Sequence, residues 1–446
     1  MLAFYNAVSA FTNWVWSLPV LVILIGGGLF LTIMCDFVQF KHFGAAMKQV
    51  LGNMFKGTSD GKISGWQAVT AALSATLGTG NIVGVGTAIA LGGPGAVFWM
   101  WVIGMVAMAL KYAEATLAVH TRSIDKDGNI TGGAPRYLGN IWKPMGIAYC
   151  ICQTVAFLIA AGVHTGSVVT GAESLGLPRI ASTAAVCVIL ALVLFGGLTM
   201  LVKITDKLVP IMAAIYLAAG LLIIILNIGN LIPALVSIFT GAFSGAAPTG
   251  GFVGATLAAT IKNGCARGMY SSDAGNGSSS FIHAQADVDD PVKQGCFGLF
   301  EVFFDTIIVC TFTALVILCT GTWTTGAPGS VLAINAFNDS LGTIGNIIAS
   351  LGLILFAGST ALSFCTFVGL CIDNMFHNKT VRYICQVIFV IIAFAGGTVG
   401  VDIMLMWADC ANAFTVGFNT LGMCILAGTL RKMTKSYFST GKSSVD

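Results

Sequence analysis

Apolar runs of about 20 residues, each long enough to cross the hydrocarbon core of a bilayer as a helix, recur along the whole chain. Polar, charged or Gly/Pro-rich links separate them, and the pattern predicts one all-α integral membrane domain over residues 1–446 with eleven transmembrane helices. Two further apolar segments are short, so we expect them at the membrane interface: residues 1–17 and 231–247. The predicted spans cover residues 18–36, 65–91, 95–120, 147–172, 181–201, 208–228, 252–284, 296–320, 344–372, 381–400 and 402–428.

Glycine-rich polar segments interrupt two of these spans near mid-membrane depth. The first interruption covers residues 77–81 (LGTGN), and the second covers residues 270–277 (YSSDAGNG). Each unpaired amide or carbonyl in hydrocarbon costs several kcal/mol, so unwound backbone persists there only where protein buries it or where it lines a polar cavity. A pair of such interruptions therefore indicates a binding site.

The composition agrees with a membrane protein. The chain is 56% hydrophobic and only 9% charged, with a mean hydropathy of +0.90, whereas soluble domains are about 25% charged. Most of the 13 cysteines lie in apolar runs, where they behave as small hydrophobic residues, and they lack the spacing of a zinc site. The basic residues form no nucleic-acid patch, and the N-terminus lacks the features of a cleaved signal peptide, so we expect the first helix to remain.

Lys and Arg residues divide unevenly between the two sides of the predicted domain. Of the 21 in the chain, only Arg179 falls in an outer link when the N-terminus is placed outside, and Lys111, Lys262 and Arg267 fall within spans. Positively charged loops stay in the cytoplasm. The distribution predicts a multi-pass protein of the cell (inner) membrane with an external N-terminus and a cytoplasmic tail over residues 429–446.

The two interrupted spans each begin a set of five helices, and the two sets run in opposite directions. With residues 18–36 as an extra helix, the first set covers residues 65–228 and the second covers residues 252–428. The topology predicts a five-plus-five inverted repeat with two discontinuous helices.

The first interruption offers groups for an ion and for an amino acid. Its glycines let the chain leave helical geometry, while Thr79 and Asn81 supply side-chain oxygens. Carbonyls freed near Ser74 and Leu77 suit Na⁺, a hard cation that prefers oxygen. The amides at the start of the next half-helix suit a substrate carboxylate. A glycine hinge or a close helix contact is the alternative explanation.

The second interruption contains an intramembrane carboxylate, Asp273, which is costly unless it is paired. Pairing with Arg267 or Lys262 gives Asp273 a structural or gating role, and direct contact with an ion or substrate is the alternative. Ser271 and Ser272 are the stronger candidates for binding through side chain and backbone.

Polar residues in three other spans complete the candidate set. Asp305 lies near mid-bilayer, where it is either a ligand for a second ion or a structural group. The hydroxyls of Ser359 and Thr360, taken alone, are typical of side chains that bond back to a carbonyl one turn earlier. We interpret His164 as a packing or interfacial group.

The chain resembles the alanine or glycine:cation symporter family, which includes sodium:alanine symporters. The resemblance covers nearly the whole chain. The motifs that carry it are residues 92–102 (GGPGAVFWMWV), 78–82 (GTGNI), 266–268 (ARG), 272–275 (SDAG), 291–295 (PVKQG) and 305–306 (DT).

The resemblance implies a leucine-transporter-like architecture and a sodium-coupled importer of small neutral amino acids, proton-coupled in some members, with no enzymatic activity and no cofactor beyond the coupling ion. By this likeness, the substrate's amino and carboxylate groups are held by Thr79, Gly80, Asn81, Ser271 and Ser272. The sodium site implied by the same likeness comprises Ser74, Leu77, Ser359 and Thr360.

Three departures from the family pattern concern the side-chain end of the pocket. Many relatives have Glu at the position of Asp273, Trp at that of Phe364, and Gln near Thr165 and Gly166. Each change removes bulk or a polar group, so a larger neutral amino acid such as glutamine or serine stays open as an alternative substrate, as does H⁺ coupling.

Two other classes of function compete with a sodium-coupled carrier that works by alternating access. A membrane enzyme is suggested only by the acidic segment 287–290 (DVDD), which a solvated loop explains more simply. A passive channel is the other alternative, and interrupted helices in oppositely directed halves argue for the carrier.

Overall fold

The computed structural model is all-α apart from one short hairpin and describes residues 10–12, 14–15, 19–54, 62–124, 130–247, 249–376, 378–399 and 401–444. The first half contains α2 (Pro19–Met34), α3 (Val38–Lys41), α4 (Phe43–Asn53), α5 (Gly65–Thr76), a π-helical turn (Gly80–Gly84), α6 (Val85–Gly92), α7 (Ala96–His120), β1 (Ser123–Ile124), β2 (Ile130–Thr131), α8 (Ala134–Ile141), α9 (Lys143–Ser174), α10 (Arg179–Leu226), a 3₁₀ turn (Ile228–Asn230) and α11 (Leu231–Ser244). The second half contains α12 (Leu257–Ser272), α13 (Ser280–His283), α14 (Pro291–Val302), a π-helical segment (Phe303–Val309), α15 (Cys310–Thr320), a 3₁₀ turn (Thr322–Thr325), α16 (Gly329–Phe376), α17 (Lys379–Val399), α18 (Val401–Ile425) and α19 (Ala427–Thr440).

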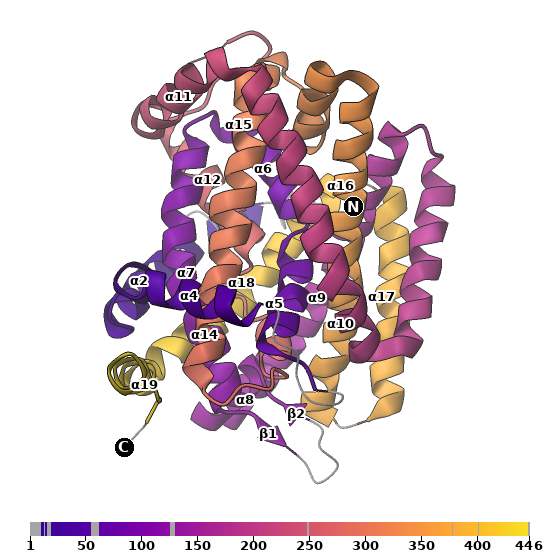
Figure 1. The fold of residues 1–446 in the computed structure, drawn as a ribbon. Helices are drawn as coiled ribbons and strands as arrows, with labels where there is room; N and C mark the ends of the chain where they lie inside the picture. Colours follow the sequence, from indigo (N-terminus) through magenta and orange to yellow (C-terminus); the bar gives the residue numbers. More distant parts are fainter. Residues whose placement is uncertain are drawn as a thin grey trace.

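The long helices stand side by side (Figure 1). The β1–β2 hairpin, α8 and α19 gather at one end of the molecule, and α11 lies at the other end. Segment 1–17, which we expected at the interface, lies mostly outside the described residues. The second expected interfacial segment forms α11, an apolar helix shorter than a full span.

Six helical segments within the described residues are long and apolar enough to cross a membrane, or up to eight if each bent pair counts as one span. The six are Ala96–His120, Lys143–Ser174, Gly197–Leu226, Pro291–Thr320, Gly329–Phe376 and Lys379–Val399. Large aliphatic side chains lie exposed on the outside, whereas ionisable side chains such as Lys111 and Glu301 are buried inside. This inside-out distribution is that of a multi-pass membrane protein.

The first predicted discontinuous helix is broken where the glycines predicted it. Ser64 starts α5 by accepting from the amide of Gln67, whose side chain accepts in return from the amide of Ser64, so the helix start is fixed. The helix ends at Thr76, and the chain resumes at Gly80 with an axis bent by 51°.

The second predicted discontinuous helix is also broken. The hydroxyl of Thr256 caps α12 at its start, and the helix ends at Ser272 because Asp273 adopts a left-handed conformation with φ 49°. Gly275 and Gly277 also have positive φ, a geometry that glycine adopts without a Cβ clash. Only four residues of helix follow, in α13, so the predicted span 252–284 is helical in its first half but mostly loop and turn thereafter.

One predicted span boundary is wrong. The turn placed between residues 201 and 208 occurs at Gly197, where φ is 56°, and Lys203 and Lys207 lie inside the helical segment that follows. The long aliphatic stem of a lysine lets it lie within the end of a membrane helix, so the two lysines did not mark the turn. The span predicted at 344–372 begins just after the turn at Gly342 (φ 60°) in α16, and a further helical stretch precedes this turn.

The α9 helix lies at the centre of the packing, against α16, α17 and α18. Small residues permit its closest contact: a Cβ built on Gly396 of α17 would lie 2.1 Å from Cα of Gly162. In a membrane, where lipid tails are as apolar as leucine, such close backbone approach is a main source of helix association. This packing holds one face of α9 beside the two broken helices.

Candidate functional site

The two helix breaks touch each other inside the helical domain. A Cβ built on Gly80 would lie 2.7 Å from Cα of Ser271, which is closer than real Cβ atoms come to another heavy atom. A Cβ on Gly78 would similarly lie 2.4 Å from Oγ1 of Thr360 on α16. Glycine at these two positions therefore lets the first break contact both the second break and α16.

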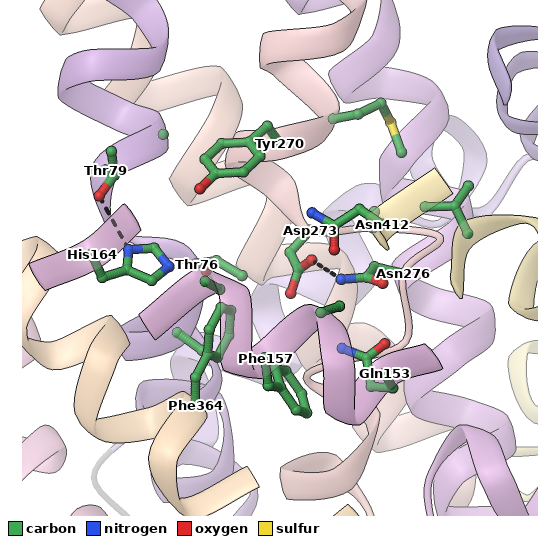
Figure 2. A pocket seen from close by; sticks show the side chains of 17 residues that line it. Thr76, Thr79, Gln153, Phe157, His164, Tyr270, Asp273, Asn276, Phe364 and Asn412 are labelled. Carbon is green, nitrogen blue, oxygen red and sulfur yellow. Dashed lines mark hydrogen bonds between the residues drawn. The ribbon is translucent and has the colours of Figure 1, made fainter. Parts of the chain in front are cut away.

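A cavity of about 40 Å³ lies where the two breaks face α9, α16 and α18 (Figure 2). Figure 2 labels ten of the residues that line it: Thr76, Thr79, Gln153, Phe157, His164, Tyr270, Asp273, Asn276, Phe364 and Asn412. The cavity is thus lined by both breaks together, and its walls are part polar and part aromatic. Such a mixture is typical of a small-molecule site.

At one end of the cavity, Thr79 and His164 form a hydrogen-bonded pair with a defined direction. The hydroxyl of Thr79 donates to Ser167 at 2.9 Å, and the hydroxyl of Ser167 donates to the carbonyl of Val163. Because the hydroxyl of Thr79 donates its single proton to Ser167, it can only accept from His164. Nδ1 of His164, 3.1 Å away, is therefore the donor to Thr79. This tautomer leaves Nε2 of His164 as an acceptor. The buried hydroxyl of Tyr270 has no hydrogen-bond partner among the described residues.

Three rings form the wall between the two ends of the cavity. The ring centroids of Phe157 and Phe364 lie 4.9 Å apart, and the His164 ring meets Phe364 edge-on at 5.2 Å. These rings form the aromatic part of the cavity wall.

At the other end, Asp273 and Asn276 are bonded to each other. Asn276 donates to Oδ1 of Asp273 at 2.6 Å, and Ser278 donates to Oδ2. The side-chain oxygen of Asn276 accepts from Thr415 of α18. Gln153 also lines this end, and neither its amide nitrogen nor its amide oxygen has a partner within the described part of the chain.

The residues predicted to hold sodium come together beside the first break. The carbonyl oxygen of Ser74 lies 3.0 Å from Oγ1 of Thr360 and 3.3 Å from Oγ of Ser359. Both hydroxyls also lie within hydrogen-bond distance of the carbonyl of Phe356, one turn earlier on α16. Leu77, the last of the predicted ligands, is fully buried at the end of α5.

Asp305 joins the two breaks from the π-helical segment between α14 and α15. Its carboxylate accepts from Asn81 of the first break, from Ser271 of the second break and from Thr306, each at 2.8 Å. The side chain is fully buried. Among the described residues, the carboxylate has three neutral donors and no Lys or Arg at hydrogen-bond distance, so when it is ionised its charge has no ion-pair partner there.

Arg267, one of the two residues predicted to pair with Asp273, is paired with a residue of α18. Arg267 donates to Asp409 of α18 at 2.9 Å and lies over the ring of Tyr270. Because α12 ends at Asp273, the carboxylate of Asp273 turns toward Asn276 and the cavity. Arg267 lies within the regular part of α12 and faces α18. Arg267 and Asp409 therefore tie α12 to α18.

Lys111 of α7 supports the loop of the second break. Its ammonium donates to the carbonyl of Asp273 at 3.1 Å and to the hydroxyl of Ser279 at 2.9 Å. Carboxylate oxygens of Glu114 and Glu301 each lie 3.6 Å away, and all these charged side chains are fully buried. This network fixes the second break to α7 and α14.

The acidic segment 287–290 forms surface ion pairs and a helix cap. Asp287 lies 3.3 Å from Lys62, and Asp289 accepts from Lys293 at 2.7 Å, which holds the pKa of Asp289 below its usual value. Asp290 caps α14. No group of three or more His, Cys, Asp or Glu side chains in the described ranges is placed to hold a metal ion.

Several residues predicted from the sequence do not line the cavity. Asn81 and Ser271 turn toward Asp305, and Ser272 bonds back to a carbonyl within α12. Gly166 packs against α17 and α18, and Thr165 is buried outside the lining. In this turn of α9 the residue that lines the cavity is His164, next to Thr165, whereas the sequence favoured a packing or interfacial role for His164.

Sequence reasoning missed Gln153 altogether and gave no role to Tyr270. The signal for Gln153 was its spacing: Gln153, Phe157, Ala160 and His164 follow one another at intervals of four, three and four residues. That spacing puts all four on one face of a helix, and the structure places all four on the cavity.

Apolar spans, buried ionisable groups and a cavity formed by two broken helices define an integral membrane transporter, a protein that moves its substrate and makes no bond. The fold is similar to that of a solved structure. A crystal structure of a mutant manganese transporter from Eremococcus coleocola matches 85% of this chain and 81% of that chain with a TM-score of 0.52, at 13% sequence identity.

The chain belongs to the sodium:alanine symporter family, whose model matches residues 1–446. It is 36% identical over 446 residues to the sodium/alanine symporter AgcS of Methanococcus maripaludis, covering 97% of each chain. It is 30% identical over 373 residues to the probable sodium/glutamine symporter GlnT of Bacillus subtilis, covering 82% of this chain and 74% of that one.

Proposed function

We propose that this protein imports a small neutral amino acid together with Na⁺ by alternating access. The observation that carries the proposal is the contact of the two helix breaks at Gly80 and Ser271 beside a partly polar cavity. Discontinuous helices that meet in this way direct their half-helix ends and freed backbone groups at one bound zwitterion and its coupling ion. The sodium and alanine named for the relative AgcS agree with this assignment.

The break end of the cavity supplies the groups that a zwitterion requires. The first amides of a helix have no partner within it, so the helix that restarts at Gly80 offers N–H groups and the positive end of its dipole to the substrate carboxylate. The unpartnered hydroxyl of Tyr270 adds a donor. The acceptor nitrogen of His164 and the freed carbonyl of Tyr270 are the proposed partners of the ammonium group.

The arrangement around Ser74 supports a sodium site. Each hydroxyl carries one proton, and the hydroxyls of Thr360 and Ser359 can both donate to the carbonyl of Phe356. The hydroxyl oxygens then face the carbonyl of Ser74 as acceptor against acceptor at 3.0 and 3.3 Å. A cation between them, completed by the carbonyl of Leu77, removes that repulsion. Na⁺ bound here joins α5 to α16.

Asp305 is our candidate for a second cation site, with the hydroxyl oxygens of Ser271 and Thr306 beside its carboxylate. The burial of the carboxylate and these two converging hydroxyls support this role, while Asn81 holds the carboxylate in place by donating its amide N–H. A proton on Asp305 is the competing way to neutralise it, which corresponds to H⁺ coupling. A purely structural carboxylate is the third outcome, and sodium titration distinguishes the three.

Alternating access requires helices that can move, and α5 has space beside it. A second cavity, of about 760 Å³, lies between α5, α10 and α14, with Trp66, Leu73 and Phe300 among its lining residues. The proposed motion swings the inner half-helix α5 into this space once Na⁺ leaves the Ser74 site. Coupling of this kind typically needs a differential free energy of about 1 to 3 kcal/mol.

The proposed topology retains eleven spans, with an extra first helix, two inverted sets of five over residues 65–228 and 252–428, and an external N-terminus in the cell membrane. The bent pair α5–α6 and the break after α12 at the start of each set support it. In this topology α19 lies on the cytoplasmic surface, in the segment 429–446.

Uptake driven by an imposed gradient tests the function. Purified protein is reconstituted into liposomes, and labelled alanine is followed with an inward Na⁺ gradient, with choline in its place, and with a pH gradient alone. We expect accumulation above the external concentration with Na⁺ only. Equal uptake with choline contradicts coupling, and accumulation with the pH gradient alone supports H⁺ in place of Na⁺.

A further inference from the structure

The cavity has a second polar end, beyond its aromatic wall from the Thr79–His164 pair. Gln153 lines this end from the same face of α9 as His164. The two residues are three turns apart, a rise of about 16 Å along the helix. Tyr149, one turn before Gln153 on this face, donates to the carbonyl of Asn276 at 2.8 Å, which places Gln153 beside the second break (Figure 2). One small amino acid therefore cannot bond to His164 and Gln153 at the same time.

The side chain of Gln153 has both a donor and an acceptor to offer. Only 1% of the residue is exposed, and neither atom of its side-chain amide has a hydrogen-bond partner in the part of the chain that the structure describes. A buried polar group without partners is costly, so such a group on a cavity indicates a ligand that completes it at some stage of the protein's work.

Asp273 adds a carboxylate to the same end of the cavity. Its two oxygens accept from neutral donors, the amide of Asn276 and the hydroxyl of Ser278. The nearby cations Lys111 and Arg267 form their ion pairs with other carboxylates. An ionised Asp273 therefore attracts a positively charged group of a ligand that enters this end.

We propose that this end of the cavity is a transit site, where the transported amino acid binds after it leaves the Thr79–His164 pair and before it reaches the cytoplasm. This inference rests on the proposed function and adds a step to it. The ammonium group of a zwitterion bonds to Oε1 of Gln153 and to the carboxylate of Asp273, and its carboxylate accepts from Nε2 of Gln153. A bare cation would leave Nε2 without a partner and an anion would leave Oε1 without one, so a zwitterion completes the amide best.

The direction of α9 puts the transit site on the path of release. In the proposed topology α9 begins on the cytoplasmic side at Lys143, so Gln153 lies nearer the cytoplasm than His164 does. The rings of Phe157 and Phe364 lie between the two polar ends, and an amino acid that moves inward passes them before it reaches Gln153. Gln153 therefore acts on an amino acid at the cytoplasmic side of the rings and takes no part in binding from outside.

The test compares the two faces of the membrane in Gln153→Met, which keeps the length of the side chain and removes its donor and its acceptor. Sodium-driven uptake of labelled alanine is measured in right-side-out and in inverted membrane vesicles, which report binding from outside and from the cytoplasmic face. We expect the half-saturating alanine concentration to rise about tenfold at the cytoplasmic face, the effect of losing hydrogen bonds to a charged ligand. At the external face it should stay within about twofold of the wild type.

A matched control is Gln386→Met, which removes a buried glutamine of α17 that does not line the cavity, and here we expect wild-type values at both faces. If Gln153→Met fails to fold, Gln153→Asn, which withdraws the amide by one methylene, must weaken binding at the cytoplasmic face alone.

An equal rise at both faces makes Gln153 part of the first binding site and overturns the proposal. No change at either face means that the amide bonds only to water, which overturns it too. Sodium-driven uptake by the wild type without a one-sided effect of Gln153 rejects this inference alone, whereas a wild type without sodium-driven uptake of any amino acid rejects the proposed function.

Discussion

The contact between the two helix breaks can be tested by adding a single methyl group at Gly80. In Gly80→Ala the new Cβ would lie 2.7 Å from Cα of Ser271, whereas ordinary contacts begin at 3.4 Å. The obstructing atom is backbone, so no side chain can rotate away. The breaks must therefore separate by about 0.7 Å or the surrounding helices must shift.

The expected loss follows from the cost of overpacking a close-packed interior, which is about 1–3 kcal/mol. Because the strain falls on the backbone groups proposed to hold the substrate, we expect apparent affinity to fall about five- to 150-fold. The assay is sodium-dependent binding of labelled amino acid to purified protein, with the folded fraction measured by size-exclusion chromatography.

A control lies one turn away on the same helix. A Cβ on Gly84 would meet nothing nearer than the carbonyl of Thr79 at 3.9 Å, so Gly84→Ala should bind within about twofold of the wild type. Wild-type affinity in Gly80→Ala, or equal losses in the two variants, would refute the reasoning that the breaks form the site by direct contact.

Three further changes probe the ions and the buried charges. Thr360→Val removes a proposed sodium ligand and should raise the half-saturating Na⁺ concentration about tenfold or more in uptake assays. The control Thr366→Val changes a hydroxyl of the same helix that donates to the carbonyl of Leu362, and it should leave this concentration within twofold of the wild type. Equal effects of the two substitutions contradict the assignment. Asp305→Asn should lower the Hill coefficient for Na⁺ from about two to about one, and an unchanged coefficient leaves Asp305 as a structural group. Lys111→Met leaves the buried Glu114 without its cation and Glu301 with only the His283 ring, so we expect a loss of stability of about 3–5 kcal/mol, seen as aggregation in size-exclusion chromatography. A monodisperse, active variant rejects the role of Lys111 in holding the second break.

The sequence predicted the elements of the fold where chemistry is local. Gly78 and Gly80 in an apolar run required a break, and the chain bends there by 51°. The turn at Gly197 was missed because Gly196 and Gly197 lie inside an apolar stretch, where hydropathy alone shows no interruption. Hydropathy responds to the lysines that follow Gly197, not to the backbone conformation at the glycine itself.

Part of the site could be predicted from the sequence. Ser74 and Thr360 lie together as the family likeness implied, but the two residue types alone did not predict that they would be in contact. Which way Asn81 and Ser271 face depends on Asp305, which lies more than 30 residues from either and reaches them only through the tertiary fold. Gln153 carried a helical spacing that sequence can reveal, but its lack of partners is visible only in three dimensions.

The central claim is that one amino acid and Na⁺ occupy the junction of the two breaks. An electron cryo-microscopy structure of the purified protein with amino acid and Na⁺ tests it most directly. The account predicts density for a zwitterion between Gly80 and Tyr270, and for a cation within bonding distance of the Ser74 carbonyl and Thr360. An amino acid bound elsewhere, with this cavity containing only water, would contradict it.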